Sequence, residues 1–150
     1  MTGGNLFWLA PLFPLAVFVL LAAGLSRSPR LAARSAVAAL TASLAIALVG
    51  LFASAGGTRL TVSVPWFSVG GRQFALALWL DPLAALMATL VAVVALLVFI
   101  YANRYMAGDP NVGRFFAELS LFAGAMLTLV LAADLFTLFI AWELVGISSY

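Results

Sequence analysis

Five long apolar stretches place the strongest constraint on how this chain folds. They cover about residues 6–25, 35–54, 82–102, 115–133 and 134–150, with more polar segments between most of them. A helix of about 20 apolar residues crosses a hydrocarbon core roughly 30 Å thick. Of the 150 residues, 66% are hydrophobic and 8% are charged, and the mean hydropathy is +1.22. Soluble domains do not have this composition, so we predict an all-α membrane protein, a bundle of about five transmembrane helices.

Three residue types, Cys, His and Lys, are absent from the sequence. Without Cys and His the chain lacks the usual ligands of haem, iron–sulfur clusters and zinc, and it forms no disulfides. The seven basic residues are all Arg, and with five acids they leave a net charge of +2. Such a small excess does not suggest nucleic-acid binding. We expect no cofactor, no metal and no nucleic acid on this chain.

The fifth apolar stretch is too short to cross a membrane. After Asp134 it contains only 16 residues, which form about 24 Å of helix, whereas roughly 30 Å is needed to cross the hydrocarbon core. We therefore expect the chain to be the N-terminal part of a longer membrane protein. The first stretch follows the residues MTGGN, which carry no basic residue, so a cleaved secretory signal is not expected.

The arginines are unevenly distributed between the two sides of the expected bundle. Five lie between the first and second stretches or between the third and fourth: Arg27, Arg30, Arg34, Arg104 and Arg114. Only Arg59 and Arg72 lie in the loop on the opposite side. Because cytoplasmic loops carry an excess of basic residues, we expect the side with five arginines to be cytoplasmic. The N-terminus would then be external, and the fifth helix would run inward.

The external loop contains two alternating apolar runs, at about residues 60–80. Val62 and Val64 alternate with polar residues before Gly70-Gly71, and large apolar residues alternate again after it. Alternation on both sides of a Gly-Gly pair is typical of a β-hairpin with a tight turn. We predict a short hairpin that packs on the membrane surface or on a neighbouring subunit. Because Pro65 interrupts the first run, a loosely ordered loop is the alternative.

Small residues recur every four positions in two of the expected helices: Ala39, Ser43 and Ala47 in the second, and Ala84, Ala88 and Ala92 in the third. Such rows allow helices to approach closely in a membrane. An Ala-rich composition also produces them by chance. They bear on packing only.

One carboxylate lies where the middle of the membrane is expected. Glu143 is the only charge in the fifth stretch after Asp134, which marks the expected membrane entry, and it lies about 13 Å deeper along the helix. An ionisable group at that depth costs roughly 3 kcal/mol on insertion scales and usually marks an ion path, a proton relay or a buried pair. We predict that Glu143 binds a proton in function. The structural alternative is a neutral carboxylic acid that orders the packing of a bundle.

Three neighbours of Glu143 are candidate supporting residues. Trp142 adjoins it, and Gly146 leaves room beside the carboxylate for water or a partner side chain. Ser149, with Ser148, could continue a hydrogen-bonded water chain inward, although serines in membrane helices more often bond to their own backbone. A carboxylate that changes its charge state needs a partner, and the apolar stretches contain no basic residue. We expect that partner later in the chain or in another subunit.

The other four acids have structural interpretations. Asp81 and Asp134 precede apolar stretches and are typical of helix N-caps. Glu118 falls in the first turn of the expected fourth helix, where a carboxylate interacts favourably with the helix dipole. Asp109, before a proline, is typical of a turn. None of them needs a catalytic role.

The run RFFAELSLFAGAMLTLVLAADLFTLFIAWELVGISSY, residues 114–150, resembles the fourth and fifth helices of the antiporter-like membrane subunits of respiratory complex I. Its most specific part is Trp142-Glu143 with the following Val-Gly and Ser-Tyr pairs. LWLDPLAALM, YANRYMAGD and the proline-bearing first stretch fit the same family. The resemblance covers essentially the whole chain and is strongest to subunit L of bacterial NADH-quinone oxidoreductase, chain 5 of the mitochondrial enzyme. Asp134 departs from it, since relatives often have Asn there.

The resemblance implies a fold and a role. The family fold is a large helical bundle built on two inverted repeats, and this chain would be the N-terminal part of its proton-conducting membrane domain. The resemblance implies that Glu143 takes part in proton translocation and pairs with a lysine on a later helix. Its partners would be other membrane subunits of complex I, the lipid bilayer and protons, in the bacterial cytoplasmic membrane. NAD, FMN, iron–sulfur clusters and quinone would bind to other subunits.

Other functions remain open. The large subunit of an Mrp-type sodium/proton antiporter shares the same helices and the Trp-Glu pair but has no redox partner, and membrane-bound hydrogenase relatives share the mechanism. In an accessory or structural membrane protein, Glu143 would only order packing. The Val-Gly and Ser-Tyr pairs after Glu143 favour subunit L.

Overall fold

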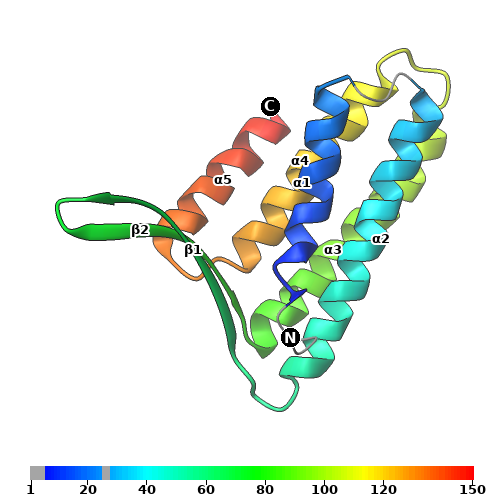
Figure 1. Cartoon of the computed structure of the whole chain (residues 1–150). Helices are drawn as coiled ribbons and strands as arrows, with labels where there is room; N and C mark the ends of the chain where they lie inside the picture. The colour runs from blue at the N-terminus through cyan, green and yellow to red at the C-terminus, as the bar shows by residue number, and fades with distance from the viewer. Residues whose placement is uncertain (1–5, 25–27) are drawn as a thin grey trace.

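A computed structural model describes residues 6–24 and 28–150. In this part of the chain four helices pack around the apolar core, a fifth helix lies at their edge, and a two-stranded sheet extends to one side (Figure 1). The elements are α1 (Leu9–Ala22), α2 (Pro29–Ser54), β1 (Leu60–Val69), β2 (Arg72–Leu80), α3 (Pro82–Tyr105), α4 (Val112–Val130) and α5 (Leu135–Ser149). Helices α2, α3 and α4 are long and apolar enough to cross a membrane, and α1 and α5 are shorter apolar helices. The prediction of an all-α membrane bundle with a small hairpin is confirmed.

Helix α1 is shorter than the expected span at residues 6–25. It begins at Leu9, and the expected end at Leu25 lies outside the described residues, as does Arg27. Pro14 lies inside the helix and has no N–H to donate to the Ala10 carbonyl. The Ser43 hydroxyl of α2 donates to that carbonyl instead, at 2.6 Å. A proline in one helix is thus matched by a serine in its neighbour.

Three helices extend further into the loops at one end than expected. Helix α2 starts at Pro29 and not near residue 35, α3 ends at Tyr105 and not near 102, and α4 starts at Val112 and not near 115. Helix α4 also ends earlier than predicted, at Val130 and not near 133, because the residues after it pair with β2. The predicted bounds followed the apolar residues, which mark only the part of a helix that lies in the hydrocarbon core. Backbone hydrogen bonds continue a helix into the more polar residues beyond it, and Pro29 is a favourable first residue for α2.

These boundaries correct the positions of four arginines and one acid. Arg30 and Arg34 lie in α2, Arg104 lies in the last turn of α3, and Arg114 lies in the first turn of α4, so all four are helical residues and not loop residues. Glu118 lies in the second turn of α4 and not the first, because α4 starts at Val112.

Strands β1 and β2 form the predicted hairpin. They pair antiparallel with Val62 opposite Leu78, and the turn is made by Gly70 and Gly71, with φ of +58° and +79°. Positive φ at both central residues fits a tight hairpin turn and favours glycine. The register shifts between Pro65 and Phe67, so the proline produces a bulge and does not prevent the strand.

Small side chains make up part of the interfaces between the helices, beside large ones such as Phe99 and Phe116. Ala39, Ser43 and Ala47 of α2 are buried, as are Ala88 and Ala92 of α3, while Ala85 is buried in place of the half-buried Ala84. The close approach of α1 to α4 depends on Gly124, because a Cβ added there would lie 2.6 Å from Cγ of Leu15. Helix α5 lies beside α4 at the edge of this bundle (Figure 1).

Candidate functional site

The start of α5 is set by Asp134, as predicted. Its Oδ1 accepts a hydrogen bond from the Thr137 N–H at 2.8 Å, which satisfies a backbone donor at the helix N-terminus. Asp81 caps α3 in the same way, accepting from the Ala84 N–H at 2.7 Å. Both N-cap predictions are confirmed. Asp109 also makes a turn, with its Oδ1 accepting from the Asn111 N–H at 2.7 Å.

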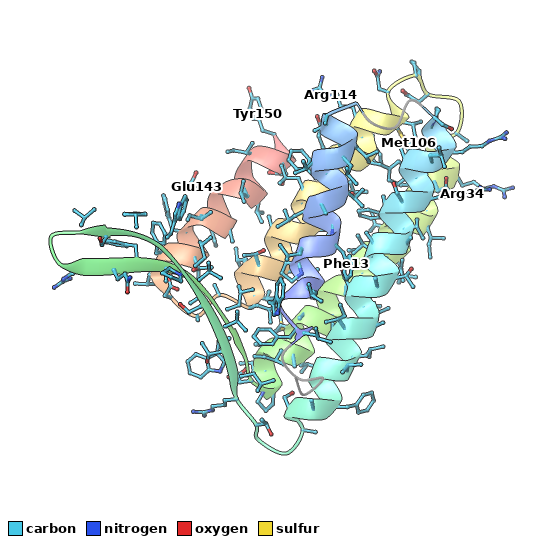
Figure 2. All side chains as sticks on the ribbon, viewed as in Figure 1. Phe13, Arg34, Met106, Arg114, Glu143 and Tyr150 are labelled. Carbon is cyan, nitrogen blue, oxygen red and sulfur yellow. The ribbon has the colours of Figure 1, made fainter. Side chains whose placement is uncertain are left out.

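Glu143 lies in the third turn of α5, on the face that points away from the bundle (Figure 2). The opposite face is defined by Thr137 and Ala141, which are 2% and 0% exposed. Two residues after Ala141, Glu143 lies about 200° around the helix axis. The same residues that pack α5 onto its neighbours therefore direct the carboxylate outward.

The carboxylate of Glu143 has no partner among residues 6–24 and 28–150. No hydrogen bond reaches it there, and the ion pair that this part of the chain forms joins Arg114 to Glu118. The side chains around it are apolar and exposed, with Trp142 at 63% and Ile147 at 67%. An acid on an apolar, uncovered helix face is chemically available to a basic group or to a proton donor that approaches from that side.

The three candidate supporting residues differ in what surrounds them. Trp142 and Gly146 lie on the exposed side of α5 with Glu143, and a Cβ added at Gly146 would meet no atom within 4 Å. The Ser149 hydroxyl donates to the Gly146 carbonyl at 3.0 Å, and that of Ser148 donates to Val145 at 2.9 Å. Both serines thus bond to their own helix, which is the commoner of the two outcomes considered for them.

Glu118 lies in a different environment from Glu143. Its Oε1 accepts from Nε of Arg114, one turn earlier in α4, at 2.7 Å. It also lines a cavity of about 260 Å³ between α4 and α5, together with Phe115, Leu119, Phe122, Ser148 and Ser149. Glu143 is not part of that cavity, so the two acids are not brought together.

Sequence reasoning missed how the hairpin holds α5. The Thr137 hydroxyl donates to Oδ2 of Asp134 at 3.0 Å and accepts from the Ala77 N–H of β2 at 2.9 Å. The ring of Phe136 lies 5.5 to 5.9 Å from the rings of Trp66, Phe67 and Phe74. An Asp followed three residues later by a Thr at the start of an apolar helix was the available signal.

The arginines of the helices lie near the helix ends that face one side of the bundle. Arg34 and Arg114 lie at the end where Tyr150 also lies (Figure 2). Arg59 lies elsewhere, with its guanidinium 5.8 Å from the centre of the Trp79 ring. Which end is cytoplasmic stays a prediction. In the described part of the chain, no group of three or more His, Cys, Asp or Glu residues could hold a metal ion.

This fold and site define an integral membrane protein in which an edge helix carries a carboxylate without a partner among the described residues. Residues 66–116 match the family described as "NADH-Ubiquinone oxidoreductase (complex I), chain 5 N-terminus". The chain is 35% identical to NAD(P)H-quinone oxidoreductase chain 5 of Picosynechococcus, over 95% of this chain and 23% of the relative. It is 37% identical to "Probable inorganic carbon transporter subunit DabB1" of Halothiobacillus neapolitanus, over 97% of this chain and 25% of the relative.

A solved structure, the Mrp complex from Dietzia, contains a similar fold. The TM-score is 0.72 at 31% identity, covering 95% of this chain and 15% of the matched chain. Along most of its length the chain is thus similar to antiporter-like membrane subunits related to chain 5 of NAD(P)H-quinone oxidoreductase. It spans about a quarter of the length of the curated relatives that it matches along most of its sequence.

Proposed function

We propose that this chain is part of a proton-translocating membrane subunit of a NADH-quinone oxidoreductase, and that Glu143 binds and releases the proton. The observation that carries the proposal is the carboxylate itself, exposed on an apolar helix without a partner in the described residues. Intramembrane acids are costly, and they usually serve ion or proton movement. Similarity to chain 5 along 95% of the sequence supports this class of protein.

Proton movement at such a site depends on its surroundings. A carboxylate in a low-dielectric environment holds its proton, and an approaching cation favours release. The outward direction of Glu143 makes it available to a side chain from outside the described bundle. We propose that this partner is a lysine on a later helix of the same protein, and that its movement changes the charge state of Glu143.

The energy for translocation comes from outside this chain. Moving one proton against 100 mV requires roughly 2.3 kcal/mol. We propose that NADH oxidation by quinone supplies it, with NAD, FMN, iron–sulfur clusters and quinone bound to other subunits. This chain would sit among other membrane subunits of that complex in a bacterial cytoplasmic membrane, where its contribution is the proton site.

Trp142, Gly146 and Ser149 have proposed supporting roles. The open space at Gly146 would admit water or the partner side chain next to the carboxylate. Trp142 would limit access of lipid and water from one side. The Ser149 hydroxyl donates its hydrogen bond within α5, but its oxygen can still accept a hydrogen bond from water.

Two transport functions are the main alternatives. Similarity to the Mrp complex favours a sodium/proton antiporter subunit without a redox partner. Similarity to a probable inorganic carbon transporter subunit over 97% of the chain favours a subunit of an inorganic carbon transporter. An accessory membrane protein, in which Glu143 only orders packing, is the third.

Inverted membrane vesicles that contain the assembled complex test these functions. We expect NADH addition to drive proton uptake by the wild type, and Glu143→Gln to reduce that uptake at unchanged abundance of the complex. Glu118→Gln, a change in the paired acid, is the matched control. Normal NADH-driven uptake in Glu143→Gln vesicles would contradict the proposal. Sodium-dependent proton exchange without NADH would support the antiporter, and bicarbonate accumulation would support the carbon transporter.

A further inference from the structure

Hydrogen bonds join the N-terminal end of α5, and the segment before it, to strand β2 of the hairpin. The backbone of Ala77 in β2 donates to Oγ1 of Thr137 at 2.9 Å and accepts from the Ala133 N–H at 2.9 Å. The Trp79 N–H donates to the Leu131 carbonyl at 2.7 Å. The segment before α5 therefore lies along β2 like a short third strand, with a bridge between Leu78 and Ala132.

The Thr137 hydroxyl is the point at which this strand-like contact meets the helix. It accepts from the backbone of β2 and donates to Oδ2 of Asp134, while Oδ1 of Asp134 accepts from the Thr137 N–H. Thr137 is 2% exposed, so water cannot readily replace either partner. One hydroxyl thus joins the hairpin, the N-cap and the first turn of α5.

This contact fixes the rotation of α5 about its own axis. Hydrogen bonds from a single buried side chain to a strand and to a cap hold it in one direction, and Ala141, one turn later, is buried on the same face. Glu143 is therefore held on the opposite side. With a carboxylate about 6 Å from the helix axis, a rotation of about 20° would move it by roughly 2 Å.

We propose that Thr137 is a positioning residue for Glu143: its hydroxyl holds α5 in the rotation that presents the carboxylate to its partner. The inference rests on the proposed proton function and deepens it. Thr137 touches neither the proton nor Glu143 and acts only through the orientation of the helix. A side chain at this position must both donate and accept, which Ser can do and Val cannot.

Substitutions at Thr137 in the assembled complex test this role. Thr137→Val keeps the shape of the side chain and removes both hydrogen bonds. We expect proton translocation per NADH oxidised to fall about threefold to tenfold, the effect of losing roughly one net hydrogen bond from an equilibrium between orientations. The pH profile of translocation should shift, because Glu143 meets its partner in a different geometry. Thr137→Ser should keep both the wild-type translocation per NADH oxidised and the wild-type pH profile.

Thr128→Val is the matched control for the loss of a threonine hydroxyl. Thr128 is half-buried in α4, and its Oγ1 donates to the Gly124 carbonyl of its own helix at 2.8 Å. For Thr128→Val we expect no change in translocation per NADH oxidised or in its pH profile. Equal losses in Thr137→Val and Thr137→Ser, or an unchanged pH profile in Thr137→Val, would overturn the positioning role.

A second measurement does not depend on proton translocation. Because this chain has no Cys, spin labels on cysteines introduced at Ile147 and Arg104 would be the labels on it. We expect Thr137→Val to shift or broaden their distance distribution by about 2 Å or more, whereas Thr137→Ser should not. If Thr137→Val lowers assembly, Thr137→Ala replaces it, since it also removes both hydrogen bonds of the hydroxyl.

The two proposals fail in different ways. An unchanged distance distribution in both Thr137→Val and Thr137→Ala would overturn the positioning role and leave the proton function standing. Full translocation in Glu143→Gln would overturn the proton function, while a changed distance distribution would still show that Thr137 orients α5.

Discussion

Polar side chains differ in their hydrogen bonding between two regions of the molecule. These regions are the interior between α1, α2 and α4 and the outward face of α5. In the interior, Ser43 donates to the carbonyl that Pro14 leaves free. Ser120 is the exception, since its buried hydroxyl has no partner in the described residues. On the outward face of α5, Glu143 has no partner there either, yet it carries the more expensive group to leave unpaired in a membrane. The difference separates polar groups that hold the fold from an exposed carboxylate, for which we propose a role in proton binding.

Replacing Glu143 by a neutral residue should have the largest effect, and that effect should be on proton translocation and not on stability. We expect Glu143→Gln to lower NADH-driven proton translocation by roughly tenfold or more, because the proposed proton site loses its titratable group. Its unfolding temperature should not fall, because the carboxylate supports no hydrogen bond in the described residues. Proton uptake and thermal unfolding of the same preparation check both parts. A variant that loses stability together with transport would indicate a structural role.

A side chain at Gly124 should disturb the interior and leave the chemistry alone. In Gly124→Ala the new Cβ would lie 2.6 Å from Cγ of Leu15 and 3.2 Å from its backbone nitrogen, so α1 and α4 must separate. We expect a loss of about 2 kcal/mol in the free energy of unfolding. Gly113→Ala is the control in the same helix, because no atom lies within 4 Å of its added Cβ. Equal unfolding of both variants would contradict the close approach.

Ser43→Ala should have a smaller effect on stability. It leaves the Ala10 carbonyl without its donor in a buried position, at a cost of about 1 kcal/mol. Pro14→Ala supplies a backbone N–H to the same carbonyl, so the loss in the double variant should be less than the sum of the two single losses. Thr41→Val, which removes an exposed hydroxyl bonded to its own helix, is the control. Strict additivity would show that Ser43 does not compensate for the proline.

Glu118→Gln should have the smallest effect of the four. The Arg114–Glu118 pair lies between exposed side chains one turn apart, where solvent screens the attraction. We expect no resolvable change in unfolding temperature or in proton translocation. The measurement is a comparison with Glu143→Gln in the same vesicles. A loss of transport equal to that of Glu143→Gln would make Glu118 a second proton site and remove the contrast between the two acids.

The sequence predicted the elements and most of the local contacts that depend on neighbouring residues. The N-caps at Asp81 and Asp134 and the Gly70-Gly71 turn follow from local backbone chemistry and are confirmed. Helix ends were less accurate, because apolarity marks the membrane depth and hydrogen bonding continues past it at Pro29 and Tyr105. The family was recognised from the Trp142-Glu143 region, and the relatives agree with it.

By itself the sequence determined that this is a membrane bundle and that Glu143 is the acid most in need of an explanation, because hydropathy and charge are properties of the chain alone. Only the tertiary structure decided where that acid points. Its direction depends on which face of α5 is buried, and that face is chosen by Thr137 meeting the backbone of Ala77, sixty residues earlier. A contact between segments so far apart in sequence has no signature in local composition, since it exists only once the hairpin and the helix have folded together.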